Sequence, residues 1–220
     1  MRTRAKLALA VVLLLVAAVP AFASTAPTGK TADQINTYYS SGLWKKAVKK
    51  QVNRAKGYII KRTEGRHKAH KPALVLDIDE TSLNNYPCFK AKGGIPYDAV
   101  VNVQCVTAFN APAINPVHSL FIFAKQHGVK VFFITARPEQ IKDGTLTNLR
   151  SAGYKGKYGL YLQPANYAQD SKIPYKSGAR KQIEQRGFHI IANVGDQQSD
   201  LKGGYSEKTF KLPNPIYKTS

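Results

Sequence analysis

Hydrophobic residues recur along this chain in two patterns. Between residues 33 and 62 they return every three or four positions, with lysines and arginines between them, which predicts amphipathic helices over 32–63. Gly42 and Gly57 are expected to divide or weaken this segment. A basic helix of this kind either packs its apolar face on its own domain, which we expect, or lies on a membrane surface.

From residue 73 onward, short continuous apolar runs alternate with stretches of helical period. The runs predict strands at 73–78, 129–135, 158–162, 189–194 and 207–212, and the stretches predict helices at 115–127, 138–152 and 174–187. Alternation of this kind predicts an α/β fold, a doubly wound, Rossmann-like parallel sheet with helices on both faces. Runs such as 131–134 suit strands that are buried on both sides.

The other segments complete a single domain over 24–220. Residues 82–114 lack a clear period, and we expect them to form a short insertion after the first core strand, lying over the site. Residues 24–31 are expected to be a flexible lead-in, and 63–71 a polar linker.

The N-terminus carries the pattern of a secretory signal peptide. Three basic residues precede an apolar run over 7–19, and Ala21 and Ala23 place small residues before a cleavage point. The alternative is a membrane anchor, which needs roughly 20 apolar residues, more than this run contains. We therefore expect residues 1–23 to be removed, which would leave a secreted or extracytoplasmic protein without a stable membrane anchor.

The composition is strongly basic. The formal net charge is +20 at pH 7, from 33 lysines and arginines against 13 acidic residues. A surplus of this size attracts anions. It indicates either nonspecific attraction to polyanions, such as nucleic acid or an acidic cell envelope, or simply a well-solvated surface. No recognised nucleic-acid-binding motif supports the first interpretation.

Two cysteines, Cys88 and Cys105, are present, both in the segment expected to be an insertion. In an exported protein, a lone pair of cysteines most often forms a disulfide. The alternative is two buried free thiols. No histidine or third cysteine lies close enough in sequence to suggest a metal site.

Polar and charged residues follow the predicted strands in a fixed order. In an open parallel sheet, ligands bind beyond the carboxyl ends of the strands, so residues at those ends share one edge. Taken alone, each signal is weak, because an Asp-x-Asp after a strand is commonly a turn or a helix cap. Together they predict a site for a hard metal ion and a phosphate group, built from Asp77, Asp79, Thr135, Lys176, Asp196 and Asp200.

The same residues resemble the motifs of a known family. Asp77-Ile78-Asp79-Glu80-Thr81, Thr135, Lys176 and Gly195-Asp196-Gln197-Gln198-Ser199-Asp200 resemble the four motifs of the haloacid dehalogenase superfamily of phosphohydrolases. Residues 134–139, 175–180 and 211–217 are similar to its secreted acid phosphatases of class B and class C type, a group that includes plant vegetative storage proteins. The resemblance covers roughly residues 33–217 and implies the haloacid dehalogenase type of fold.

The resemblance implies a role for each motif residue. Asp77 would be the nucleophile and would form an aspartyl-phosphate. Asp79 would protonate the leaving alcohol and then activate water, so its pKa is expected to be raised. Thr135 and Lys176 would stabilise the transferring phosphoryl group.

The resemblance also implies magnesium as the cofactor, because a carboxylate that attacks a phosphate dianion needs a cation to offset the repulsion. The expected ligands are the carboxylates of Asp77 and Asp196 and the backbone carbonyl of Asp79. Asp200 is expected behind them, where it would orient the ligands or Lys176.

Substrate contacts are expected along the same edge. Lys172 is the alternative to Lys176 as the catalytic lysine, and Arg137 either contacts the phosphate or has a structural role. Tyr86, Phe89 and Tyr97 either stack on a nucleoside or aryl leaving group or pack the insertion. The expected substrate-binding residues are Asn85, Thr135, Ala136, Arg137 and Lys176.

These expectations combine into a secreted, magnesium-dependent acid phosphatase acting on small phosphomonoesters, whether nucleotide, sugar or aryl phosphates. One alternative is a phosphotransferase that uses an alcohol acceptor in place of water. Another is a catalytically weak storage or anion-binding protein on the same fold. The presence of Asp77 argues against the last, because an inactive protein has no need of the nucleophile.

Overall fold

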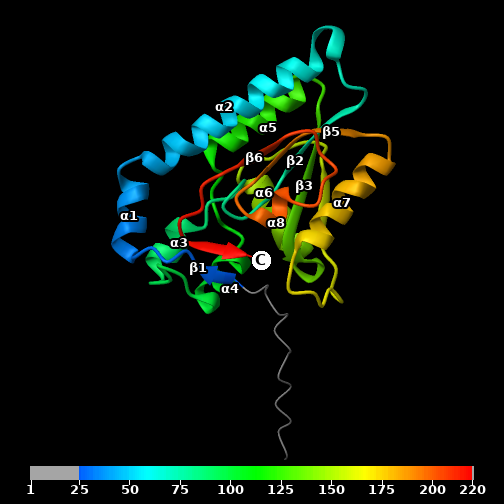
Figure 1. Cartoon of the computed structure of the whole chain (residues 1–220). Helices are drawn as coiled ribbons and strands as arrows, with labels where there is room; N and C mark the ends of the chain where they lie inside the picture. Colours follow the sequence, from blue (N-terminus) through cyan, green and yellow to red (C-terminus); the bar gives the residue numbers. More distant parts are fainter. Residues whose placement is uncertain (1–24, 220) are drawn as a thin grey trace, which may run out of the picture.

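A computed structural model describes residues 25–219, so the predicted signal peptide at 1–23 lies outside the described residues (Figure 1). Its centre is a five-stranded sheet, with strand order β4-β3-β2-β5-β6, in which every pair is parallel. The prediction of an α/β fold with a parallel sheet is confirmed. The strands are β2 (Pro72–Leu76), β3 (Lys130–Pro138), β4 (Gly159–Gln163), β5 (His189–Gly195) and β6 (Thr209–Lys211).

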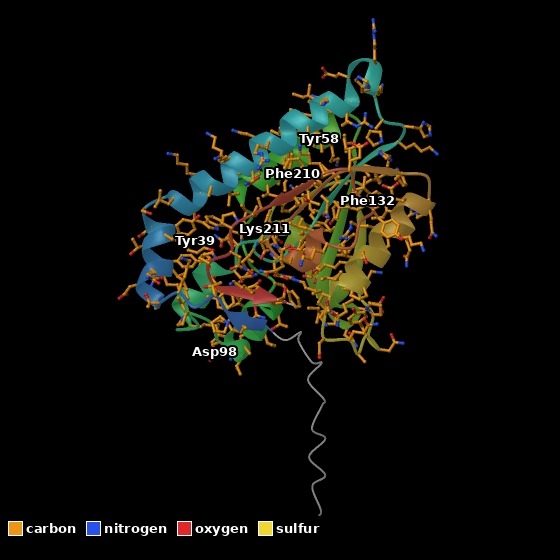
Figure 2. All side chains as sticks on the ribbon, viewed as in Figure 1. Tyr39, Tyr58, Asp98, Phe132, Phe210 and Lys211 are labelled. Atoms are coloured by element: carbon orange, nitrogen blue, oxygen red, sulfur yellow. A yellow bond between two sulfur atoms is a disulfide. The ribbon has the colours of Figure 1, made fainter. Side chains whose placement is uncertain are left out.

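Helices cover both faces of the sheet (Figure 1). One face packs against α2 (Leu43–Thr63), α5 (Asn115–Gln126) and α6 (Lys142–Ser151), and the other packs against α7 (Ile173–Gln185). Side chains of a strand alternate between the two layers. Within β3, Phe133 belongs to the layer with α2 and Phe132 to the layer with α7. In Figure 2, Phe210 of β6 lies beneath α2 and Phe132 lies on the α7 side.

The N-terminal segment forms α1 (Ala32–Ser40) and α2, and Gly42 divides them in a left-handed conformation with φ 77°. Gly57 lies inside α2 and does not interrupt it. The apolar face of α2, including Trp44, Val48 and Ile59, is buried in the core of the domain, so this helix packs on its own domain. Across residues 25–219, no helix is long and apolar enough to cross a membrane.

The expectation of a flexible lead-in over 24–31 is wrong. Residues Thr25–Pro27 form β1, which pairs antiparallel with β7 (Tyr217–Thr219). This strand had no local signal, because its hydrogen-bonding partner lies at the other end of the chain.

The segment 82–114 contains two helices that the sequence pattern did not predict, α3 (Tyr86–Ala91) and α4 (Ala99–Thr107). The disulfide expected between Cys88 and Cys105 is present and joins these two helices. Both are short, and short helices are marginal alone, so their stability comes from tertiary contacts, of which this crosslink is one.

Other boundaries differ by a few residues. The helix predicted from 138 begins later, because β3 continues to Pro138 and is followed by the 3₁₀ turn η2 (Glu139–Ile141). A second 3₁₀ turn, η1 (Gly65–His67), lies in the predicted linker. The short helix α8 (Gln198–Leu201), which carries Asp200, was not predicted.

Candidate active site

The acidic, hydroxyl and lysine side chains of the predicted site come from separate elements. Asp77 directly follows β2, Asp196 directly follows β5, and Thr135 lies toward the end of β3. Lys176 lies near the start of α7, and Asp200 belongs to α8. Because the strands are parallel, their carboxyl ends lie along one edge of the sheet.

Lys176 lies between two carboxylates. Its Nζ donates to Asp77 Oδ1 at 2.7 Å and also to Asp200 Oδ1. All three side chains are at most 8% exposed. Burial by itself would lower the pKa of Lys176, but the charges of Asp200 and Asp77 raise it well above its usual value. The lysine therefore stays protonated. Lys172, the alternative catalytic lysine, instead donates to the Gln169 carbonyl at 3.4 Å and lies over the ring of Tyr167 at 4.9 Å.

Three buried carboxylates form a cluster that could hold a metal ion. One oxygen each from Asp77, Asp196 and Asp200 lie within 4.8 Å of one another. Burial raises the pKa of Asp77, the charge of Asp200 raises it further, and Lys176 only partly opposes this. Lys176 contacts two of the three carboxylates, Asp77 and Asp200, and oxygen ligands of this kind suit a hard divalent cation such as Mg²⁺. The side chain of Asp79 is not part of this cluster.

Asp196 is held by neutral donors. Thr81 Oγ1 donates to its Oδ1 at 2.8 Å, and Gln197 Nε2 and Asn214 Nδ2 donate to its Oδ2 at 2.5 and 2.9 Å. Burial, then the charge of Asp200, raises the pKa of Asp196 to about 6, against the effect of these donors. Asn214 had no predicted role, although it lies in one of the stretches that carried the family resemblance.

The environment of Asp79 differs from the expectation. Arg137 Nε donates to Asp79 Oδ2 at 2.9 Å, Arg137 Nη2 donates to Oδ1 at 2.7 Å, and Asn85 Nδ2 donates to Oδ1 at 2.8 Å. Burial alone would raise the pKa of Asp79, but the charge and hydrogen bonds of Arg137, with the bond from Asn85, lower it below its usual value. The expectation of a raised pKa is wrong, because three donors stabilise the anion.

The remaining residues predicted to bind substrate lie along the same edge. Thr135 is buried, and its Oγ1 accepts the backbone N–H of Arg137 at 3.1 Å. Ala136 is half-buried between them. Asn85 and Arg137 were also predicted to contact substrate, and both side chains contact Asp79.

Two residues without an expected role at the site form a buried pair. Tyr217 donates its hydroxyl to Glu80 Oε2. Burial and then the charges of Asp79 and Asp196 raise the pKa of Glu80 to about 8. Glu80 was expected only to shape the turn after Asp77, and its φ of 54° shows that it also does this. The sequence signal that could have identified Glu80 as part of the site was its place within the first motif, directly after Asp79.

The aromatic residues of the insertion pack against other rings. Phe89 is fully buried and lies near Tyr97 and Tyr217, with ring centroids 6.3 Å away in each case. Tyr86 stacks on Tyr39 at 3.7 Å. Of the two interpretations, packing of the inserted segment therefore describes Tyr86 and Phe89.

Comparison with known proteins gives consistent matches. The model of the HAD superfamily, subfamily IIIB (acid phosphatase), matches residues 7–220. The chain is 36% identical over 146 residues to Acid phosphatase 1 of Solanum lycopersicum, covering 65% of this chain and 57% of that protein. It is 30% identical over 147 residues to Vegetative storage protein 2 of Arabidopsis thaliana, covering 65% and 55%. The chain thus spans less than two thirds of the length of these curated relatives.

A solved structure shares the fold. The class C acid phosphatase from Bacillus anthracis matches with a TM-score of 0.67 and 22% sequence identity, and the match covers 83% of each chain. At this identity the likeness concerns the arrangement of helices and strands, and it agrees with the parallel sheet described above.

Proposed function

Because the chain belongs to subfamily IIIB of the HAD superfamily, the acid phosphatases, we propose that it hydrolyses small phosphomonoesters with the help of magnesium. The observation that carries this proposal is the buried cluster at the sheet edge. There Asp77 contacts Lys176 at 2.7 Å, and its carboxylate lies within 4.8 Å of those of Asp196 and Asp200.

In the proposed reaction, a carboxylate oxygen of Asp77 attacks the phosphorus atom and the bond to the leaving alcohol breaks. The product is an aspartyl-phosphate, which water then hydrolyses to restore the carboxylate. Lys176 stays charged beside Asp77 and offsets the negative charge that gathers there. Thr135 would donate its hydroxyl to a phosphoryl oxygen.

The acidic cluster supplies the ligands for a cation. Asp77 and Asp196 would hold Mg²⁺ through carboxylate oxygens and Asp79 through its backbone carbonyl, with Asp200 behind them. When bound, the ion would supply positive charge against the phosphate dianion. The raised pKa values of Asp77 and Asp196 support this role, because they reflect buried negative charge without enough positive charge beside it.

Asp79 would protonate the leaving alcohol and then accept a proton from the attacking water. The ion pair with Arg137 lowers the pKa of Asp79 and favours its ionised form, which suits the second step. The first step needs the protonated form. A bound phosphate brings negative charge close to Asp79, and like charges raise the pKa of a carboxyl group.

A location outside the cytoplasm also belongs to this proposal. The disulfide between Cys88 and Cys105 supports it, because such bonds persist in oxidising compartments. A storage role is the second candidate, favoured by the likeness to a vegetative storage protein. The two roles can be distinguished because a phosphatase hydrolyses phosphomonoesters repeatedly, whereas a storage protein does not.

The test is hydrolysis of 4-nitrophenyl phosphate with Mg²⁺ and with EDTA, followed by a panel of nucleotide and sugar phosphates. We expect Asp77→Asn to lose at least about 10³-fold in rate, since no aspartyl-phosphate can form. Asp33→Asn, an exposed aspartate on α1, is the matched control and should keep full activity. Absence of hydrolysis across the panel would favour storage, and full activity of Asp77→Asn would refute the proposed nucleophile.

A further inference from the structure

Asn85 is held in one orientation beside Asp79. Its Nδ2 donates to Asp79 Oδ1 at 2.8 Å and lies 3.5 Å from Glu80 Oε2, while its Oδ1 has no hydrogen-bond partner among the described residues. Rotating the amide by half a turn would place that oxygen against the ionised carboxylate of Asp79. The side chain therefore keeps its N–H₂ group toward Asp79, even though a buried acceptor stays unpaired.

Glu80 holds Asn85 in place through the main chain. Its Oε1 accepts the backbone N–H of Asn85 at 3.0 Å. Glu80 is 1% exposed, whereas the side chain of the preceding residue, Asp79, is 19% exposed. The backbone turns at Glu80, with φ 54°, and the two consecutive carboxyl groups have different environments, Glu80 in the interior and Asp79 toward the site.

Tyr217 in turn holds Glu80. Its hydroxyl donates to Glu80 Oε2, and its ring packs near Phe89 and Tyr97, with centroids at 6.3 and 5.5 Å. Its backbone is anchored by the pairing of β7 with β1 and by a hydrogen bond from its N–H to Asn214 Oδ1 at 3.2 Å. The hydroxyl thus comes from a rigid, buried part of the C-terminal segment.

From these contacts we propose that Tyr217, Glu80 and Asn85 act as positioning residues for Asp79, so that the C-terminal strand supports the acid step. This inference rests on the proposed function, in which Asp79 protonates the leaving alcohol. Arg137 and Asn85 hold Asp79 from two sides. Without the donor from Asn85, Arg137 is the side chain that still holds the carboxylate, so the position of Asp79 is less well fixed for proton transfer.

The leaving group provides a readout that a merely structural role would not move. An alkyl phosphate expels a poor leaving group and needs its proton, whereas 2,4-dinitrophenyl phosphate expels a stable anion and does not. Loss of a positioned acid therefore lowers kcat/KM for the alkyl substrate selectively. Loss of folding, of the nucleophile or of the metal lowers kcat/KM for both.

The experiment measures kcat/KM of the full-length protein with Mg²⁺ on glycerol 2-phosphate and on 2,4-dinitrophenyl phosphate. Asn85→Ala, which keeps the backbone N–H on Glu80, is expected to lose about tenfold or more on the alkyl substrate and less than about threefold on the aryl one. Tyr217→Phe keeps the ring and should show the same selectivity to a smaller extent. Asp79→Asn removes the proposed acid itself, so it gives the largest loss of kcat/KM expected on the alkyl substrate.

Tyr58→Phe is the matched control, because Tyr58 also donates its hydroxyl to a glutamate, Glu207 at 2.9 Å. Tyr58 belongs to α2 (Figure 2) and has no contact with Asp79, Glu80 or Asn85. It should change neither rate. Equal losses on both substrates in Asn85→Ala and Tyr217→Phe, or no loss on the alkyl substrate in either, would overturn the inference while leaving the proposed function standing. A wild-type protein that hydrolyses neither substrate would overturn both.

Discussion

Replacing Lys176 with methionine tests the electrostatic balance of the site. The change keeps most of the side-chain volume and removes the positive charge that lies between Asp77 and Asp200. The two carboxylates then face each other in a buried place without a counter-ion. We expect this loss of balance to reduce stability as well as activity.

The size of the effect follows from the burial of all three groups, each at most 8% exposed. Removing one partner of a buried ion pair typically costs about 3–5 kcal/mol, because the other charge stays desolvated. For a domain of this size, each kcal/mol lowers Tm by about 2–4 °C, so Tm should fall by roughly 6–20 °C. Hydrolysis should fall by about 10²–10³-fold, as on loss of one group that stabilises charge in the transition state.

The loss of stability should depend on pH. In the variant, burial and Asp200 still raise the pKa of Asp77, and the lowering effect of Lys176 is gone. The folded state then holds protons that the unfolded chain releases above about pH 4. Because the folded state binds more protons, its stability falls as pH rises through the raised pKa. The difference from wild type should be larger at pH 8 than at pH 5.

The assay is urea denaturation at pH 5 and pH 8 in EDTA, so that no divalent cation replaces the lysine. Lys46→Met, an exposed lysine on α2, is the control and should lie within about 0.5 kcal/mol of wild type. A penalty below about 1 kcal/mol, or the same penalty at both pH values, would refute the reasoning that the buried charge on Lys176 balances the two aspartates.

Three other changes have measurable outcomes. Mg²⁺ should bind more weakly at pH 5 than at pH 7.5 in calorimetric titration, because the pKa of Asp196 is raised to about 6 and a ligand must be deprotonated; equal affinities would contradict this. Cys88→Ser removes a disulfide between positions 17 apart and should lower the free energy of unfolding by about 3 kcal/mol. Hydrogen exchange should become faster in α3 and α4 alone, and faster exchange in α2 would argue against this localisation. Glu207 accepts hydrogen bonds from Arg62, His189 and Tyr58, and its pKa is lowered from 4.5 to about 2. Glu207→Gln should therefore lower the free energy of unfolding by about 1–2 kcal/mol at pH 7, discounted for solvent exposure. The difference from wild type should fade between pH 4.5 and pH 2, and an unchanged difference at pH 3 would contradict this.

The core of the fold was predictable because it depends on local patterns. Residues 131–134 are apolar at every position, which suits a strand buried on both faces, and β3 lies there between β2 and β4. The strands β1 and β7 were not predictable, since Thr25–Pro27 has no apolar period and is ordered by pairing with residues at the far end of the chain. The helices α3 and α4 depend in the same way on a crosslink and on packing.

The residue types at the site were visible in the sequence, and their contacts were not. Asp77 and Asp196 end strands, so their place at one edge follows from the parallel topology alone. Which groups contact Asp79 depends on how three separate segments approach one another. Arg137 from the end of β3 and Asn85 from the start of the insertion bring three hydrogen-bond donors to it, and they reverse the expected direction of its pKa.

The sequence by itself therefore determined the order of the core strands and of the helices that pack on them, the edge where the chemistry lies and the side chains available there, because these follow from hydrophobic period and strand direction. The tertiary structure alone decided the partners and protonation of each carboxylate. The physical reason is that a pKa depends on the burial, charges and donors within a few ångströms, and in the folded chain those neighbours come from distant parts of the sequence.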